Sequence, residues 1–177
     1  MAKVHITTLA HTWALAYLHP ETIALDATCG QGNDTLFLSK HAKTVYALDI
    51  QSEALEAAKK RCIDCSNILY HQKDHSLVDT LALPPLDLVM FNLGYLPKSD
   101  HQITTKPETT AIAIQKAALL LKQGGALLIT SYLHDQGSER DAVLKTLLSI
   151  PKLAITRSYR NDSLASPLLL EAVKVFK

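Results

Sequence analysis

Residues 91–97, FNLGYLP, bring polar and turn-forming side chains directly after the apolar run LDLVM. Gly94 and Pro97 break a strand ladder, while Asn92 adds a hydrogen-bonding amide and Tyr95 a flat ring to the same bend. Ligands of open α/β sheets bind at the carboxyl ends of strands, so this bend is a candidate binding site. The alternative is a plain turn in which Tyr95 belongs to the core.

A second candidate site is the stretch DATCGQGNDT at residues 26–35, which follows another short apolar run. Gly30 and Gly32 allow a tight turn that approaches a ligand closely. A dinucleotide fingerprint would require a third glycine at position 35, where threonine stands. The carboxylate of Asp34 suits an ammonium group better than a pyrophosphate. The turn therefore favours the methionine end of S-adenosylmethionine (SAM) over NAD.

Two further strand ends carry acidic residues. Asp49 lies about 20 residues beyond the glycines, where an acid accepts hydrogen bonds from ribose hydroxyls; the alternative is that it caps the helix that follows. Asp74 could accept from an adenine amino group, with His75 beside it. His71, Asp74 and His75 could instead form a metal cluster, but a strand and its turn need not bring them together. No metal is expected.

These sites require a framework of alternating strands and helices. Strands are expected at residues 23–28, 44–49, 67–74, 86–92, 125–132, 154–160 and 168–176. Helices are expected at the N-terminus, from Asp34 onward and at residues 52–62. A fourth helix should begin at Pro107 and stop at Gly124 and Gly125. A fifth should begin at a capping box formed by Ser138 and Asp141 and run through Leu148. This order predicts a doubly wound α/β fold with a mostly parallel sheet. The last two strands have no helix between them, so they form an antiparallel hairpin.

Composition is that of an ordinary globular protein and predicts a single domain over residues 1–177, with 47% apolar and 20% charged residues. The net charge of +1 gives no bulk signal of nucleic-acid binding. No apolar run reaches the roughly 20 residues that span a bilayer, and polar residues interrupt the N-terminal stretch. We expect an amphipathic first helix, a cytoplasmic protein and no membrane partner. The three cysteines predict reduced thiols, and Cys62 and Cys65 lack the second pair that a zinc site needs.

The motifs DATCGQGNDTLFL, ALDIQ, FNLGYLP and ITTKPETT (residues 103–110) together resemble the rRNA methylase family of small class I SAM-dependent methyltransferases. Members are understood as tRNA wobble-uridine methyltransferases, which convert 5-aminomethyl-2-thiouridine to its methylaminomethyl form. The resemblance implies a Rossmann-like methyltransferase fold with a seven-stranded sheet. It also implies SAM as cofactor and the anticodon loop of tRNA as partner. A homodimer is possible.

Carried over residue by residue, the resemblance also implies the site. Asn92 and Tyr95 match the outer positions of an Asn-Pro-Pro-Tyr box, in which the asparagine accepts from the target nitrogen and the ring packs on the base; Leu-Gly replaces Pro-Pro here. His11 would close over the cofactor. The implied SAM contacts are Ala27, Thr28, Gly30, Gly32, Asn33, Asp34, Asp49, Ile50, Asp74, His75, Asn92 and Leu93. The implied acceptor contacts are Gly94, Tyr95, Thr105, Lys106 and Thr109. The stretch SYLHDQG departs from the family's Tyr-Pro-Gly-His-type turn, so no acceptor contact is assigned to residues 132–137.

RNA recognition needs cations and a stacking ring. Tyr95 is the stacking candidate, and the phosphate candidates are Lys98, Lys106, Arg157 and Arg160. Any one of these cations could equally be a solvated surface charge. Alternatives to the wobble-uridine enzyme are an rRNA methyltransferase, a small-molecule amine N-methyltransferase and a non-catalytic SAM-binding protein. An NAD-dependent oxidoreductase fits less well, because the third glycine and a substrate domain are missing.

Overall fold

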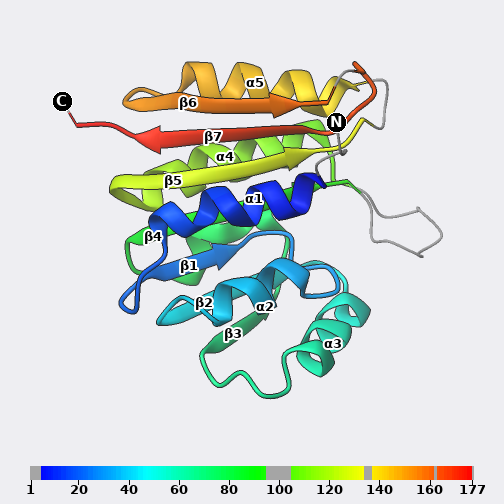
Figure 1. Ribbon diagram of the computed structural model, residues 1–177, viewed down its shortest axis with the longest axis vertical. Helices are drawn as coiled ribbons and strands as arrows, with labels where there is room; N and C mark the ends of the chain where they lie inside the picture. Colours follow the sequence, from blue (N-terminus) through cyan, green and yellow to red (C-terminus); the bar gives the residue numbers. More distant parts are fainter. Residues whose placement is uncertain (1–4, 95–104, 134–136, 162, 177) are drawn as a thin grey trace.

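The computed structural model describes residues 5–94, 105–133, 137–161 and 163–176. Within them one seven-stranded sheet has the order β3-β2-β1-β4-β5-β7-β6 (Figure 1). The strands are β1 (Ile23–Asp26), β2 (Thr44–Asp49), β3 (Ile68–Gln72), β4 (Leu86–Leu93), β5 (Leu121–Ser131), β6 (Leu153–Arg160) and β7 (Leu168–Lys174). The first five pair in parallel, and β7 pairs antiparallel with both β5 and β6. The predicted doubly wound sheet with an antiparallel C-terminal hairpin is confirmed.

Helices cover both faces of the sheet. They are α1 (Ile6–Ala14), α2 (Asn33–Ser39), α3 (Ser52–Arg61), α4 (Pro107–Leu120) and α5 (Ser138–Ser149), with the 3-10 segments η1 (Leu15–Tyr17) and η2 (His75–Leu81). In Figure 1, α1, α2 and α3 lie on the near face, and α4 and α5 lie on the far face. The strand order reverses between β1 and β4, so ligands are expected at the carboxyl ends of these two strands.

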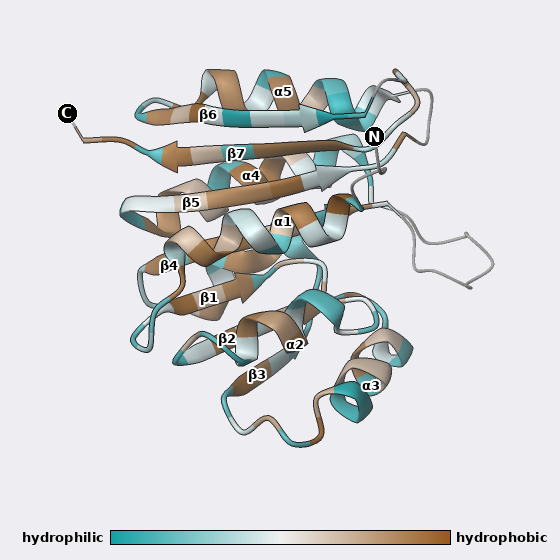
Figure 2. Ribbon diagram, viewed as in Figure 1, coloured by the Kyte–Doolittle hydropathy of each residue, from teal (hydrophilic) through white to brown (hydrophobic). Residues whose placement is uncertain are grey.

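Apolar clusters lie between the helices and both faces of the sheet, and a small one with Leu55 and Ala58 packs α3 against β2. One cluster packs α4 and α5 against one face of the strands through buried residues such as Ile114 and Leu147. Another packs α1 and α2 against the other face through residues such as Ala10 and Leu38. Figure 2 shows the matching pattern, with hydrophobic central strands and polar residues on the outer surface of α3. Among the described residues, none of the helices has the length and apolar character needed to cross a membrane.

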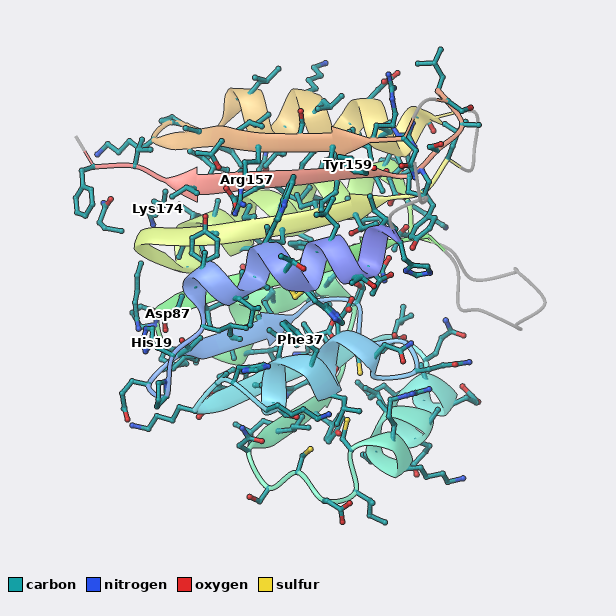
Figure 3. The ribbon with its side chains drawn as sticks, viewed as in Figure 1. His19, Phe37, Asp87, Arg157, Tyr159 and Lys174 are labelled. Atoms are coloured by element: carbon teal, nitrogen blue, oxygen red, sulfur yellow. The ribbon has the colours of Figure 1, made fainter. Side chains whose placement is uncertain are left out.

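The end of α4 differs from the sequence prediction. The helix was expected to continue to a stop at Gly124 and Gly125, but it ends at Leu120 and β5 begins at Leu121. Lys174 at the end of β7 supplies the missing cap, since its Nζ donates to the carbonyl groups of Ala118, Leu119 and Leu121 at 3.2, 3.2 and 2.7 Å. Figure 3 labels this lysine. A side chain 53 residues away therefore ends the helix, which the local sequence does not reveal.

Two other local predictions are corrected. The capping box of Ser138 and Asp141 is wrong, because Gly137 is the N-cap of α5, with a positive φ of 91°, and no side chain caps the helix. The sequence also left residues 75–81 unassigned, whereas they form η2, whose N-cap Asp74 accepts from the Ser76 N–H at 2.8 Å. The starts of α5 and η2 each depend on one or two residues, which is fewer than a periodic sequence pattern needs to give a signal.

Candidate functional site

A pocket of about 890 Å³ opens at the carboxyl ends of β1 and β4. This volume lies within the usual range for small-molecule sites, about 300–1,000 Å³. Most of the predicted site residues line it: Ala27, Thr28, Gly30, Asn33, Asp34, Asp49, Ile50, Asp74, His75, Asn92, Gly94, Thr105, Lys106 and Thr109. Of the remaining predictions, His11, Gly32 and Leu93 do not line the pocket, and Tyr95 and Lys98 fall outside the described residues.

The turn after β1 is organised by the buried carboxylate of Asp26. Its two oxygens accept from the Thr28 N–H at 3.2 Å and from the Thr35 hydroxyl at 2.6 Å. Burial, together with the nearby charge of Asp34, raises the pKa of Asp26 to about 7. Thr35, which stands where a dinucleotide fingerprint has glycine, thus has a role of its own in holding the turn.

Gly32 allows this turn to pack against α3. Its φ is +80°, and a Cβ at this position would lie 2.8 Å from the Cα of Ala58. A side chain would therefore collide with the backbone of α3 as well as adopt a disfavoured conformation. Gly32 shapes the turn from behind, which accounts for its absence from the pocket lining.

Asp49 at the end of β2 connects the same turn to α3. One carboxylate oxygen accepts from the Gly30 N–H at 2.8 Å, and the other accepts from the Gln51 N–H at 2.9 Å. Burial raises the pKa of Asp49 and these backbone donors oppose the shift. Asp49 is not the cap of α3, because Gln51 is the N-cap and no side chain caps the helix. Asp49 instead lines the pocket, and its ribose contact stays a prediction.

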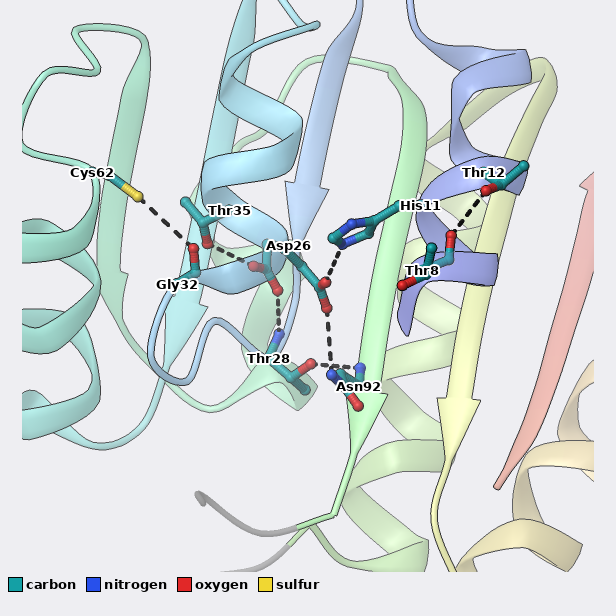
Figure 4. A network of polar contacts seen from close by, with 10 residues as sticks. Thr8, His11, Thr12, Asp26, Thr28, Gly32, Thr35, Cys62 and Asn92 are labelled. Carbon is teal, nitrogen blue, oxygen red and sulfur yellow. Dashed lines mark hydrogen bonds and ion pairs between the residues drawn. The ribbon is translucent and has the colours of Figure 1, made fainter. Parts of the chain in front are cut away.

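Asn92, at the end of β4, joins the pocket to α1 and α2 (Figure 4). Its backbone N–H donates to the Thr28 hydroxyl at 2.7 Å, and its Nδ2 donates to Asp34 at 3.4 Å. The other oxygen of Asp34 lies 2.7 Å from His11 Nε2. The end of β4, which the sequence analysis identified, is thus held at the pocket by contacts to the turn after β1 and to α2.

His75 and Asp74 form the far wall, after β3. Burial lowers the pKa of His75, against the opposing charges of Asp74 and Asp49. His75 Nε2 is buried and has no hydrogen-bond partner among the described residues. Over those residues, no group of three or more His, Cys, Asp or Glu side chains is placed to hold a metal ion. His75 is a candidate ligand-binding residue because it lines the pocket.

The structure adds pocket residues that sequence reasoning did not find. Tyr132 and Leu133 follow β5, and Ala165 and Pro167 lie in the turn between β6 and β7. We assigned residues 132–137 no acceptor contact because their turn departs from the family pattern, yet two of them line the pocket. Their position at the end of a parallel strand was the available signal.

Arg157, one of the phosphate candidates, forms contacts with other residues of the protein. The Arg157 guanidinium forms an ion pair with Glu171, with Nε at 2.9 Å from Oε1, and lies over the Trp13 ring at 4.6 Å from its centroid. Because Trp13 belongs to α1 and Arg157 to β6, this contact links the helix to the sheet; Figure 3 labels Arg157. Arg157 thus has a structural role, and its phosphate contact stays a prediction. Lys106 lines the pocket and is exposed, and Arg160 is exposed at the end of β6.

Comparisons with known proteins agree with this geometry. Residues 45–169 match the family described as "Putative rRNA methylase". A solved structure described as a putative rRNA-methylase from Clostridium thermocellum has a TM-score of 0.91 and 31% identity, covering 99% of this chain and 100% of that one. A putative methyltransferase from Streptococcus mutans, in complex with SAH, has a TM-score of 0.89 and 34% identity, with 99% and 100% covered.

A curated relative from Arabidopsis thaliana, a chloroplastic tRNA (mnm(5)s(2)U34)-methyltransferase, is 34% identical over 155 residues. The match covers 76% of this chain, and the chain spans 55% of the length of that relative. The SAH complex of the Streptococcus mutans protein supports the expected cofactor, SAM. By its sequence match over residues 45–169 and its fold over nearly the whole chain, this protein belongs to the "Putative rRNA methylase" family.

Proposed function

We propose that the protein is a SAM-dependent N-methyltransferase that converts 5-aminomethyl-2-thiouridine to 5-methylaminomethyl-2-thiouridine at the wobble position of tRNA. The observation that carries the proposal is the position of Asn92. Its side chain donates to Asp34, and Asn92, Asp34 and Gly94 line one pocket. The name of the Arabidopsis thaliana relative supports the choice of acceptor.

The pocket fits the cofactor. Asp34 presents a carboxylate where an ammonium group would be bound, and Asp49 presents another at the end of β2, the usual place for a ribose hydroxyl. His75 adds a buried nitrogen with no described partner on the side expected for the adenosine. When bound, SAM supplies a methyl group on a sulfonium, which a nucleophile can take by in-line displacement.

The acceptor amine must be neutral to attack. An aliphatic amine is mostly protonated at neutral pH, with a pKa of about 10.4 like that of lysine. Burial in the pocket disfavours the charged form. Because Asn92 Nδ2 donates to Asp34, its Oδ1 is the amide atom that can accept from the amine. A neutral acceptor orients the nitrogen without the salt bridge that would keep it protonated.

The test is nucleoside mass spectrometry on tRNA that carries 5-aminomethyl-2-thiouridine, incubated with the purified protein and SAM. Gain of one methyl group at the wobble position, lost in Asn92→Ala, is the expected result. Bound SAM with no methyl gain would discard the wobble-uridine assignment. Parallel reactions with rRNA, which the family description favours, and with amine metabolites then separate an rRNA or small-molecule enzyme from a non-catalytic SAM-binding protein. A homodimer and a cytoplasmic location stay predictions.

A further inference from the structure

The acceptor side of the pocket has two walls that are far apart in the sequence. One wall contains Thr105, Lys106 and Thr109, at the start of α4, and the other contains Ala165 and Pro167, in the turn between β6 and β7. Neither wall belongs to the framework of the parallel sheet. Something must therefore hold each wall at a fixed distance from Asn92.

Glu139, in the first turn of α5, holds the first wall. Its side chain is fully buried, and it accepts from the hydroxyls of Thr105 at 2.8 Å and Thr110 at 2.6 Å. Thr105 in turn donates its backbone N–H to the Gly94 carbonyl at 3.1 Å. Hydrogen bonds to a charged acceptor are stronger than neutral ones. The end of β4, the start of α4 and the start of α5 are thus joined through one carboxylate.

Arg140, the next residue, holds the second wall. It is 7% exposed, and its Nη1 donates to the Leu164 carbonyl at 2.9 Å. Its Nη2 donates to the carbonyl groups of Ser166 at 3.0 Å and Ser131 at 3.2 Å. The turn that carries Ala165 is thereby fixed to the end of β5. Consecutive helical residues point about 100° apart, which lets one helical turn reach both walls.

We propose that Glu139 and Arg140 are a pair of positioning residues, which set the separation of the two acceptor walls and so select and orient the acceptor. Neither residue lines the pocket, so each acts through the segment it holds. The inference rests on the proposed function for the identity of the acceptor only. The anchoring contacts themselves are independent of it.

Four variants test the pair. Glu139→Gln keeps the shape but replaces one acceptor oxygen by a donor, and Thr110→Val removes a buried hydroxyl that does not line the pocket. Arg140→Lys keeps the charge but loses the planar fork that reaches three carbonyl groups. The matched control is Thr146→Val, the same change at a buried position of α5 away from the pocket. Each variant is assayed below its melting temperature for SAM affinity, for acceptor KM and kcat, and for amide hydrogen exchange.

We expect the first three variants to raise the acceptor KM roughly tenfold, because small displacements of a positioning wall are costly, while SAM affinity stays within about twofold. Exchange should increase at residues 105–110 in Glu139→Gln and Thr110→Val, and at residues 164–166 in Arg140→Lys. The control should show neither change. An unchanged acceptor KM, or exchange that increases evenly along the chain with SAM affinity falling in parallel, would overturn the proposal.

The same experiment separates this inference from the proposed function. If the wild-type protein transfers no methyl group to the tRNA, the wobble-uridine proposal fails. Amide hydrogen exchange alone then tests whether Glu139 and Arg140 hold the two walls. Local increases at the two walls would then support the pair. No local increase would refute it, whatever the acceptor is.

Discussion

His11 of α1 and Asp34 of α2 are joined by a 2.7 Å contact between Nε2 and Oδ1, although 23 positions separate them in the sequence. The His11 ring also stacks on Phe37, with centroids 3.9 Å apart and planes within 4°. Asp34 lines the pocket and His11 does not. The first helix therefore acts on the cofactor side of the pocket through this carboxylate.

His11→Ala should weaken SAM binding by about tenfold, the equivalent of one hydrogen bond to a charged group. Without the imidazole, Asp34 loses the contact that orients it toward the pocket. Titration calorimetry with SAM measures the change. His41→Ala is the matched control, because His41 contacts the same Phe37 at 5.1 Å but has no bond to Asp34. Equal affinities for His11→Ala and the wild type would refute a role for the contact.

Asn92→Ala should lower turnover by about 100-fold or more, since positioning and polar contacts to the reacting group supply much of such a rate. SAM affinity should fall less than in His11→Ala, because the Thr28 bond uses the backbone N–H of residue 92 and the side-chain bond lost to Asp34 is long, at 3.4 Å. The measurement is single-turnover methyl transfer with calorimetry in parallel. Asn67→Ala removes two structural bonds to the carbonyl groups of Ser39 and Ala42, and should cost stability rather than turnover. Undiminished turnover in Asn92→Ala would contradict the assigned role.

Gly32→Ala should destabilise the protein by about 1–3 kcal/mol more than Gly124→Ala does. Both glycines have a positive φ, 80° and 77°, but only at Gly32 would the new Cβ meet backbone, with Ala58 Cα at 2.8 Å. At Gly124 no atom lies within 4 Å. Urea denaturation gives the free energy of unfolding of both variants. Because both share the backbone strain, the difference between them measures the steric overlap with Ala58. Equal losses would show that α3 moves aside at little cost.

Much of this architecture could be predicted from the sequence because strand ends and turns are local signals. The run LDLVMFN gave β4, and the glycines at 30 and 32 with Asp49 gave the cofactor side of the pocket. The acceptor side could be predicted only partly. Ala165 and Pro167 carry no chemical signature, and they reach the pocket because Arg140 holds their turn.

The failed predictions have two causes, one long-range and one local. The end of α4 depends on the contacts of Lys174, at the end of β7. Each of these contacts joins elements that only the tertiary fold brings together. The local cause concerns Ser138: a capping box needs it as the N-cap, but Gly137 is the N-cap of α5.

Asp26→Asn should change how stability depends on pH. Burial raises the pKa of Asp26 to about 7 in the folded protein, above the unfolded value of about 3.9. Between these values the folded state retains a proton that the unfolded chain has lost, so stability falls as pH rises from about 4 to 7, by up to about 1.4 kcal/mol per unit. The asparagine variant lacks this decline. Urea unfolding across this range should give curves of different slope.

Asp79→Asn is the control for that experiment. Asp79 is an exposed residue whose pKa is lowered by its hydrogen bond to Lys116. The contribution of ionised Asp79 to stability is present at neutral pH and is lost as pH falls. Its effect on stability therefore changes with pH in the opposite direction to that of Asp26. Parallel stability curves for the wild type and Asp26→Asn would show that Asp26 is ionised throughout.

Lys106→Ala should weaken tRNA binding and reduce the slope of log affinity against log salt by about one, as expected for one lost phosphate contact. Lys106 is exposed at the rim of the pocket. Arg157→Ala removes the same charge, but the guanidinium is bound to Glu171, which is 2% exposed. That variant should lose about 1–3 kcal/mol of stability, because the buried Glu171 loses its cation and keeps only neutral partners such as Thr156, and it should keep the wild-type salt slope. Filter binding at several salt concentrations measures both slopes. A reduced slope for Arg157→Ala, with Lys106→Ala unchanged, would place the RNA on the β6 side of the molecule instead of at the pocket.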